Sequence, residues 1–110
     1  MRQILEELEF TCTEAENGAL AYDFCDKIMP DLIMLDWNMP VLNGIEFLKK
    51  LRSMENGGKP NVIFCTTEND MSRIQMAIQE GANDFIMKPF DKEILRTKLV
   101  QNGILQDTAY

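Results

Sequence analysis

Three short apolar runs, each followed by a polar residue, limit the folds open to this chain more than any other feature. They cover residues 32–35, 62–65 and 85–87, and none of them alternates between apolar and polar positions. Continuous apolar runs of this length are typical of parallel strands that helices cover on both faces. We therefore expect three buried strands.

Helical spacing fills most of the segments between these runs. Apolar residues recur every three or four positions within 2–8, 20–28, 45–51, 74–78 and 94–100, whereas 10–15 alternates like a short strand. The first of these helices has no start signal before it, and Asn17-Gly18 marks a turn after the short strand. Alternating strands and helices predict an α/β fold with a doubly wound parallel sheet and helices on both faces.

Composition predicts one globular domain over residues 1–110. The chain holds no apolar stretch near the ~20 residues that cross a bilayer. Carboxylates near its N-terminus do not suit a secretory signal, so we expect a cytoplasmic protein without membrane contact. A net charge of -7 and scattered basic residues oppose direct binding to nucleic acid.

The absence of histidine excludes several kinds of site. Ser-His-Asp and Cys-His catalysis both need an imidazole, and widely spaced cysteines without histidine do not suit zinc. We expect Cys12, Cys25 and Cys65 to be reduced and mostly buried.

Asp36, Thr66 and Lys88 stand at the ends of the three apolar runs. Open parallel sheets bind ligands at the carboxyl ends of their strands, so we expect these three side chains at one edge. Polar residues often begin loops, and each alone would mean little. Together they suit phosphoryl transfer to the Asp36 carboxylate, with positive charge from Lys88 and a hydroxyl donor from Thr66.

Several spaced motifs extend this pattern, and with them the chain resembles the CheY-like response-regulator receiver family from Met1 to about Asn102. Trp37 and the segment 65–68 suggest the single-domain, chemotaxis-type branch. The resemblance implies a flavodoxin-like sheet with strand order 2-1-3-4-5. The motifs that carry it are Asp36-Trp37-Asn38-Met39-Pro40, Asn43-Gly44, Thr66 and Lys88-Pro89-Phe90.

The resemblance also implies roles for individual residues. Asp36 would be the phosphoacceptor, Lys88 the phosphate-binding lysine and Thr66 the hydroxyl that moves toward the phosphoryl group. The backbone carbonyl of Asn38 would bind Mg²⁺, and Phe85 would be the aromatic residue that changes burial on activation. For Phe85 and Trp37, simple core packing is an equally good explanation. The Lys88-Pro89 peptide bond would be cis.

The implied function is that of a switch in two-component signal transduction. A histidine kinase would phosphorylate it, and it would signal by contact with a downstream protein that the sequence does not identify. The family's usual contact surface comprises the helix after Thr66, the strand around Phe85 and the last helix. As an enzyme the chain would at most phosphorylate itself from small donors and dephosphorylate itself.

One family feature is absent, because no strand ending in an acidic pair precedes the helix at residues 2–8. Asp36 and the Asn38 carbonyl alone should hold Mg²⁺ weakly, and Glu16 and Glu68 are better described as surface carboxylates. We therefore expect poor phosphorylation of this chain.

The absent strand would lie in the middle of the family's sheet and leave two unpaired edges. Those edges could close directly, accept a strand from a second molecule in a strand-swapped dimer, or belong to a longer chain in which Met1 is internal. We favour the longer chain.

Two other functions stay open. A degenerate receiver could act as a binding module independent of phosphorylation, which the absent acidic pair supports. A phosphohydrolase of the haloacid-dehalogenase type also uses an aspartate at a strand end. That family needs a second aspartate two residues later, where this chain has Asn38, and a cap domain that does not fit this length.

Overall fold

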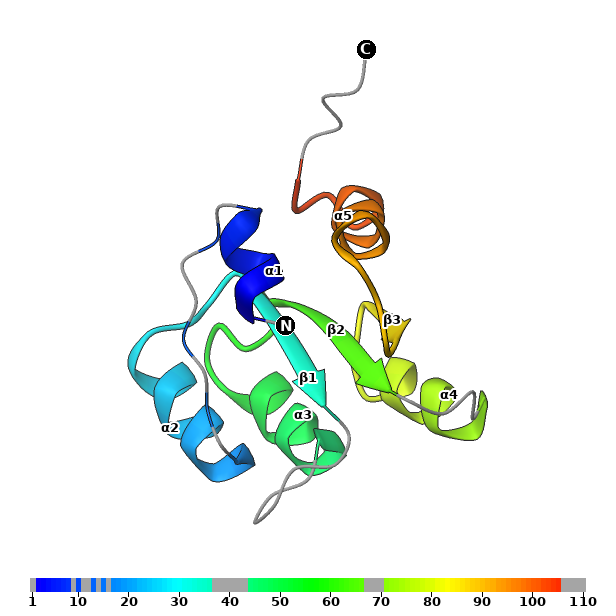
Figure 1. Ribbon diagram of the computed structural model, residues 1–110. Coiled ribbons are helices and arrows are strands. Elements are labelled where there is room, and N and C mark those ends of the chain that lie inside the picture. Colours follow the sequence, from blue (N-terminus) through cyan, green and yellow to red (C-terminus); the bar gives the residue numbers. More distant parts are fainter. Residues whose placement is uncertain are drawn as a thin grey trace.

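The computed structural model describes residues 2–8, 10, 13, 15, 17–36, 44–66 and 71–105 of the chain. Helices and strands alternate through most of this part, as the sequence predicted (Figure 1). The elements are α1 (Arg2–Glu7), α2 (Gly18–Lys27), β1 (Leu32–Asp36), α3 (Gly44–Ser53), β2 (Asn61–Thr66), α4 (Met71–Gln79), β3 (Asp84–Met87) and α5 (Lys92–Gln101).

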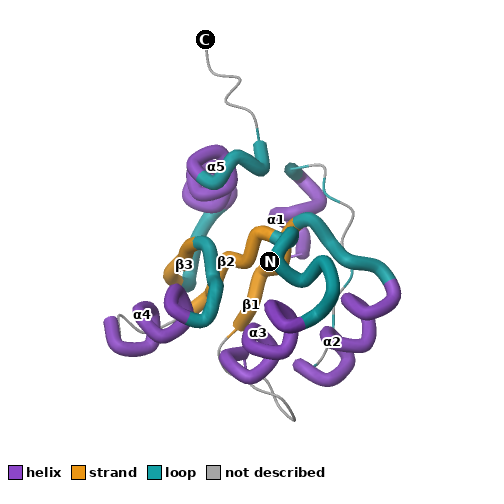
Figure 2. Tube along the Cα trace, turned by 180° about the vertical axis from the view of Figure 1, so that it is seen from behind, coloured by secondary structure: helices purple, strands orange, loops and turns teal. Residues whose placement is uncertain are grey.

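The three strands form a parallel sheet in the order β1-β2-β3. In the register of this sheet, Leu35 lies opposite Phe64, which lies opposite Phe85. Helices cover both faces: α1 and α5 lie on one side of the strands and α2, α3 and α4 on the other, in both views (Figures 1 and 2). This is the flavodoxin-like α/β arrangement expected from the sequence.

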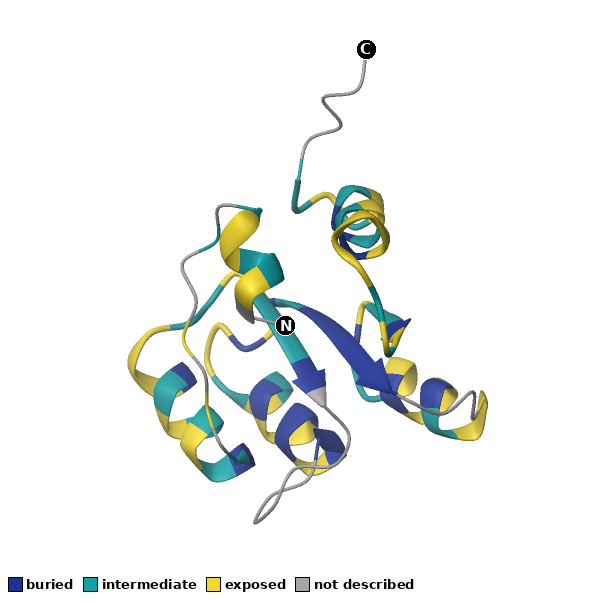
Figure 3. Cartoon of the chain, in the orientation of Figure 1, coloured by how far each residue is buried: buried dark blue, intermediate teal, exposed yellow. Residues whose placement is uncertain are grey.

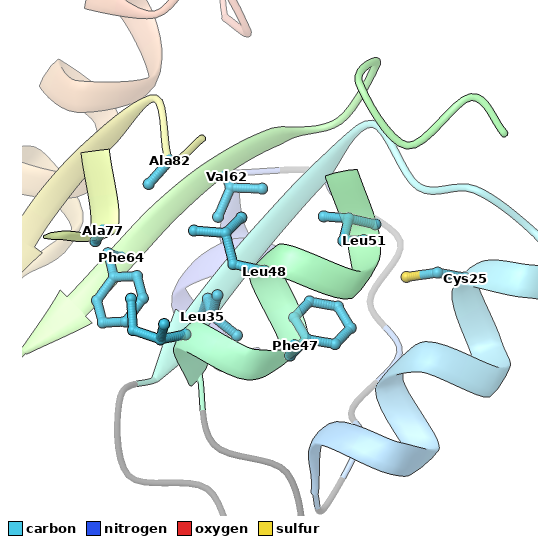
Figure 4. Packing of buried hydrophobic residues seen from close by; sticks show 10 residues of the cluster. Cys25, Leu35, Phe47, Leu48, Leu51, Val62, Phe64, Ala77 and Ala82 are labelled. Carbon is cyan, nitrogen blue, oxygen red and sulfur yellow. The ribbon is translucent and has the colours of Figure 1, made fainter. Parts of the chain in front are cut away.

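Two clusters of buried side chains hold these layers together, and burial is concentrated on the inward sides of the strands and helices (Figure 3). We call them the α3-face cluster, which Figure 4 shows from close by, and the α5-face cluster. The α3-face cluster contains Cys25, Leu35, Ile45, Phe47, Leu48, Leu51, Val62, Phe64, Ala77 and Ala82. The α5-face cluster contains Ile63, Cys65, Ile86, Leu95 and Leu99.

The clusters follow from two sequence periods. Neighbouring residues of a strand point to opposite faces, so Phe64 joins the α3-face cluster and Cys65 the α5-face cluster. On α3 the apolar residues lie on one helical stripe, and Phe47, Leu48 and Leu51 are all fully buried. The sheet is therefore fixed on both faces by apolar contact.

The strand predicted over residues 10–15 is not formed by the residues of that segment that the structure describes. Phe10, Thr13 and Ala15 lie outside any strand, and residues 11, 12 and 14 lie outside the described part. The backbone N–H of Phe10 donates to the Leu5 carbonyl of α1, and its ring packs against the α5-face cluster. Local alternation was a poor guide here, because strand preference depends on a neighbouring strand.

Two smaller expectations can also be compared with the structure. Cys25 and Cys65 are free, buried thiols, as predicted, whereas Cys12 lies outside the described residues. Within the part of the chain that the structure describes, no helix has the length and apolar character needed to cross a membrane.

Candidate functional site

The carboxyl ends of the three strands lie side by side, and they carry the residues that the sequence singled out. Asp36, the last residue of β1, lies opposite Cys65, which directly precedes Thr66. Thr66, the last residue of β2, lies opposite Met87, which directly precedes Lys88. The register thus brings the backbones of Asp36, Thr66 and Lys88 to one edge of the sheet.

A backbone hydrogen bond continues the ladder beyond the end of β3. The N–H of Lys88 donates to the carbonyl oxygen of Thr66 at 2.7 Å, which ties the Lys88 backbone to the tip of β2. The next peptide bond, Lys88-Pro89, is cis, as the resemblance implied. Thr66 is 9% exposed and Lys88 is half-buried, so Thr66 is the more deeply buried of the two.

Part of the predicted site lies outside what the structure describes. This holds for the side chain of Asp36, for Trp37, Asn38 and Asn43, and for Glu16 and Glu68. The backbone of Asp36 is described, and it forms the end of β1. At this edge the structure therefore describes the backbones of Asp36, Thr66 and Lys88 and the side chains of Thr66 and Lys88.

The chemistry of the described side chains gives a limited fit to a metal ion. Among the described residues, no three of the histidine, cysteine, aspartate and glutamate type are grouped so that they could hold one. Mg²⁺ commonly binds through one or two carboxylates, with water and phosphate oxygens completing its octahedron. Asp36 carries one such carboxylate, and its backbone lies at this edge.

The start of β3 carries a group of charged and polar contacts that the sequence did not predict. The Nζ of Lys98, on α5, lies 3.1 Å from Asp84 Oδ1 and 4.9 Å from the centroid of the Phe85 ring. Asn102, just after α5, donates from Nδ2 to Asp84 Oδ2 at 2.9 Å. These partners are 13 to 18 residues apart in the chain, and no local pattern marks such a pair; only the placement of Asp84 directly before the singled-out Phe85 pointed to this position.

Comparison with known proteins agrees with the geometry. Residues 1–100 match the response regulator receiver domain family. A CheY homolog of Campylobacter jejuni is 37% identical over 87 residues, which are 78% of this chain and 67% of that protein.

Two solved structures also resemble the fold. The chemotaxis protein CheY4 of Vibrio cholerae superimposes with a TM-score of 0.84 at 29% identity, covering 94% of this chain and 84% of the other. The receiver domain of a Pseudomonas aeruginosa sensor histidine kinase, which holds a magnesium ion in its active site cleft, superimposes with a TM-score of 0.83 at 27% identity. The match covers 91% of this chain and 82% of that one.

These matches do not favour either alternative function, the hydrolase or the phosphorylation-independent module. The matched family and the matched folds agree with the parallel sheet, in which the carboxyl ends of the three strands lie at one edge. The chain belongs to the response regulator receiver domain family, the phosphoacceptor switches of two-component signal transduction.

Proposed function

We propose that this chain accepts a phosphoryl group from a histidine kinase on Asp36 and passes the signal on by protein contact. The observation that carries the proposal is the register of the sheet, in which the ends of β1, β2 and β3 lie together with Asp36, Thr66 and Lys88. Membership in the receiver family supports the same reaction.

The proposed step needs no general base, because a carboxylate nucleophile has no proton that must be removed before it attacks. One carboxylate oxygen attacks phosphorus and forms a new P–O bond. The bond from phosphorus to the donor breaks, and the donor atom keeps its electron pair; this atom is nitrogen in phosphohistidine and oxygen in acetyl phosphate. Lys88 would offset charge on the phosphoryl oxygens, and the Thr66 hydroxyl would donate a hydrogen bond to one of them.

Mg²⁺ belongs to this proposal as a weakly bound ion. The Asp36 carboxylate and the Asn38 backbone carbonyl would hold it, and the ion would offset negative charge on the phosphoryl group. Weak binding predicts that labelling of Asp36 rises with Mg²⁺ into the millimolar range. Labelling that saturates at micromolar Mg²⁺ would contradict the weak site.

Output by protein contact is supported by apolar residues on the surface formed by α4, β3 and α5. Met71, Met87 and Ile94 expose 38% to 56% of their area. Where exposed apolar side chains form a contiguous patch, that patch is typically a protein interaction site. We infer that a downstream protein binds this surface.

Labelling with acetyl phosphate tests the central claim. The unchanged chain should gain 80 Da by intact-mass spectrometry, and Asp36→Asn should abolish the gain because the amide is a poor nucleophile. Lys88→Met should reduce the labelling rate by about 100-fold or more, in the range found for removal of one electrostatic stabiliser. Autodephosphorylation is followed by loss of the same mass after the donor is removed.

Asp31→Asn is the matched control, because Asp31 directly precedes β1 and lies at the opposite end of the strand from Asp36. It is exposed, and its replacement should leave labelling unchanged. Equal labelling of the Asp36→Asn and Asp31→Asn variants would show that the phosphoryl group is carried elsewhere.

A further inference from the structure

One backbone donor on the outer edge of β3 is satisfied by a side chain. β3 is the last strand of the described sheet, and it hydrogen-bonds to β2 on its inner side. On its outer side the backbone N–H of Phe85 donates to Asp84 Oδ1 at 2.8 Å. The carboxylate therefore satisfies a backbone donor that another strand would otherwise have paired.

Lys98 connects this carboxylate to the aromatic ring of the next residue. Asp84 and Phe85 are neighbours in β3, so their side chains leave opposite faces of the sheet. The Phe85 ring packs against the α3-face cluster, whereas α5 contributes Leu95 and Leu99 to the α5-face cluster. Lys98 thus extends from α5 to a ring that belongs to the opposite face, with Nζ 4.9 Å from its centroid.

The Asp84 carboxylate that binds the Lys98 ammonium group is itself held by Asn102. Asp84 accepts from Lys98 at 3.1 Å and from Asn102 at 2.9 Å, while Asn102 Nδ2 also donates to the Lys98 carbonyl at 2.8 Å. The side chains of Lys98 and Asp84 are only 26% and 22% exposed. Partial burial strengthens the attraction between a cation and a ring face.

We propose that Lys98 is a positioning residue that holds the Phe85 ring in its present place through charge, and that activation has to break this contact. The inference rests on the proposed function and on the family resemblance, which implies that Phe85 changes its burial on activation. A contact that exists in only one arrangement shifts the population toward that arrangement by its own free energy. Loss of the Lys98 charge should therefore ease every movement of the ring.

A double-mutant cycle tests the contact between the two residues. Lys98→Met keeps the apolar stem and removes the charge, and Phe85→Leu removes the ring. The two changes should be coupled by about two- to five-fold in the unfolding equilibrium constant, the range of a cation-π contact of ~0.5–1 kcal/mol. Additive effects would overturn the positioning role, because a purely structural Lys98-Asp84 pair would not depend on the ring.

Lys50 offers a matched control. Lys50 is on α3, and its Nζ lies 5.6 Å from the centroid of the Tyr22 ring on α2. Lys50→Met combined with Phe85→Leu should give additive effects, and coupling of the same size would show that the cycle reports a change in net charge. The control has the same change of charge and stem as Lys98→Met.

Labelling with acetyl phosphate tests the link to activation. Phosphorylation should favour another position of the ring, and in Lys98→Met the contact that opposes this position is lost. Lys98→Met should therefore be labelled about two- to five-fold faster than the unchanged chain. Lys50→Met should label at the unchanged rate.

The two proposals fail in distinguishable ways. Unchanged or slower labelling of Lys98→Met, beside normal labelling of the unchanged chain, would overturn the activation role of Lys98. Absence of labelling in every variant, the unchanged chain included, would overturn the proposed function. The double-mutant cycle would still decide whether Lys98 positions Phe85, because it needs no phosphorylation.

Discussion

Arg52 and Lys98 are two partly buried cations of this fold, and they hold it in different ways. Arg52, on α3, donates five hydrogen bonds to oxygens that follow α3 or precede β3. Its acceptors are the carbonyls of Gly57, Pro60 and Gly81 and the side-chain oxygen of Asn83, at 2.7 to 3.1 Å. Lys98 contacts one carboxylate, that of Asp84, and one aromatic ring, that of Phe85.

The difference follows from the chemistry of the two side chains. A guanidinium is planar and presents five donors in a fixed arrangement, so one group can bind several carbonyls that point toward it. An ammonium on a flexible stem is a point charge, and it can leave one partner without rearranging a backbone. Arg52 is therefore suited to fix the loops at the amino ends of β2 and β3. Lys98 is suited to a contact that can be broken.

Replacing Arg52 should give the largest loss of stability among these contacts. Arg52→Met keeps most of the stem and removes every donor, which leaves backbone carbonyls in a partly buried place without partners. We expect the free energy of unfolding to fall by about 2–3 kcal/mol, since each such group can cost ~1–3 kcal/mol and some regain water. Chemical denaturation followed by circular dichroism would measure it.

The contrast with Lys98 provides the control for this experiment. Lys98→Met removes one ion pair and one ring contact near the surface, so it should cost about 1 kcal/mol or less. Arg52→Lys should recover little, because a single ammonium cannot reach the acceptors of Arg52 together. If Arg52→Met cost no more than Lys98→Met, the distinction between a fixed and a breakable contact would be wrong.

Gly81, which accepts two of the Arg52 hydrogen bonds, should give the next largest effect. Its φ of 115° disfavours any residue with a Cβ, and an added Cβ would lie 2.9 Å from Arg52 Cγ. We expect Gly81→Ala to lower the free energy of unfolding by about 1–2 kcal/mol, mainly through the backbone. Thermal unfolding would show the loss as a fall in Tm of several degrees.

Gly58 is a matched control for this change. It lies in the loop before β2, a Cβ added there would meet no atom within 4 Å, and its φ is not positive. Gly58→Ala should therefore leave stability nearly unchanged. Equal losses for the two variants would mean that alanine harms these loops in general, and that the place of Gly81 against Arg52 is not special.

Strands and site could be predicted from the sequence because their signals are local. The apolar runs at 32–35, 62–65 and 85–87 correspond to β1, β2 and β3 within a residue or two at each end, and parallel topology then brings Asp36, Thr66 and Lys88 to one edge. The roles of these three residues stay predictions.

The contacts of Arg52 and Lys98 could not be predicted in the same way. Arg52 reaches Gly81 across 29 positions, and Lys98 reaches Asp84 across 14. Which acceptor a long cation reaches depends on how the helices lie over the sheet, and composition and spacing do not contain this information. The described residues of the strand expected at 10–15 lie outside any strand for a related reason, since pairing with a distant partner decides whether an alternating segment becomes a strand.

The smallest expected effect concerns pH and sharpens the description of the Lys98 contact. Burial by itself raises the pKa of Asp84. Hydrogen bonds from Asn102, from the Phe85 N–H and from Lys98, together with the charge of Lys98, more than offset this and lower the pKa below its ordinary value. A carboxyl group with a lowered pKa in the folded chain contributes stability above its unfolded pKa, about 3.9, and this contribution is lost as the pH falls through the folded pKa.

Asp84→Asn removes the titrating group, so the difference in free energy of unfolding between the unchanged chain and this variant should be largest near pH 6 and shrink below about pH 4. Denaturation at a series of pH values would measure it. In a Lys98→Met background the difference at pH 6 should be smaller, because Lys98 supplies part of the lowering. A difference that stayed constant down to pH 2 would mean that Asp84 acts as a neutral hydrogen-bond acceptor, and the charge on Lys98 would then have no ionic partner to hold it beside Phe85.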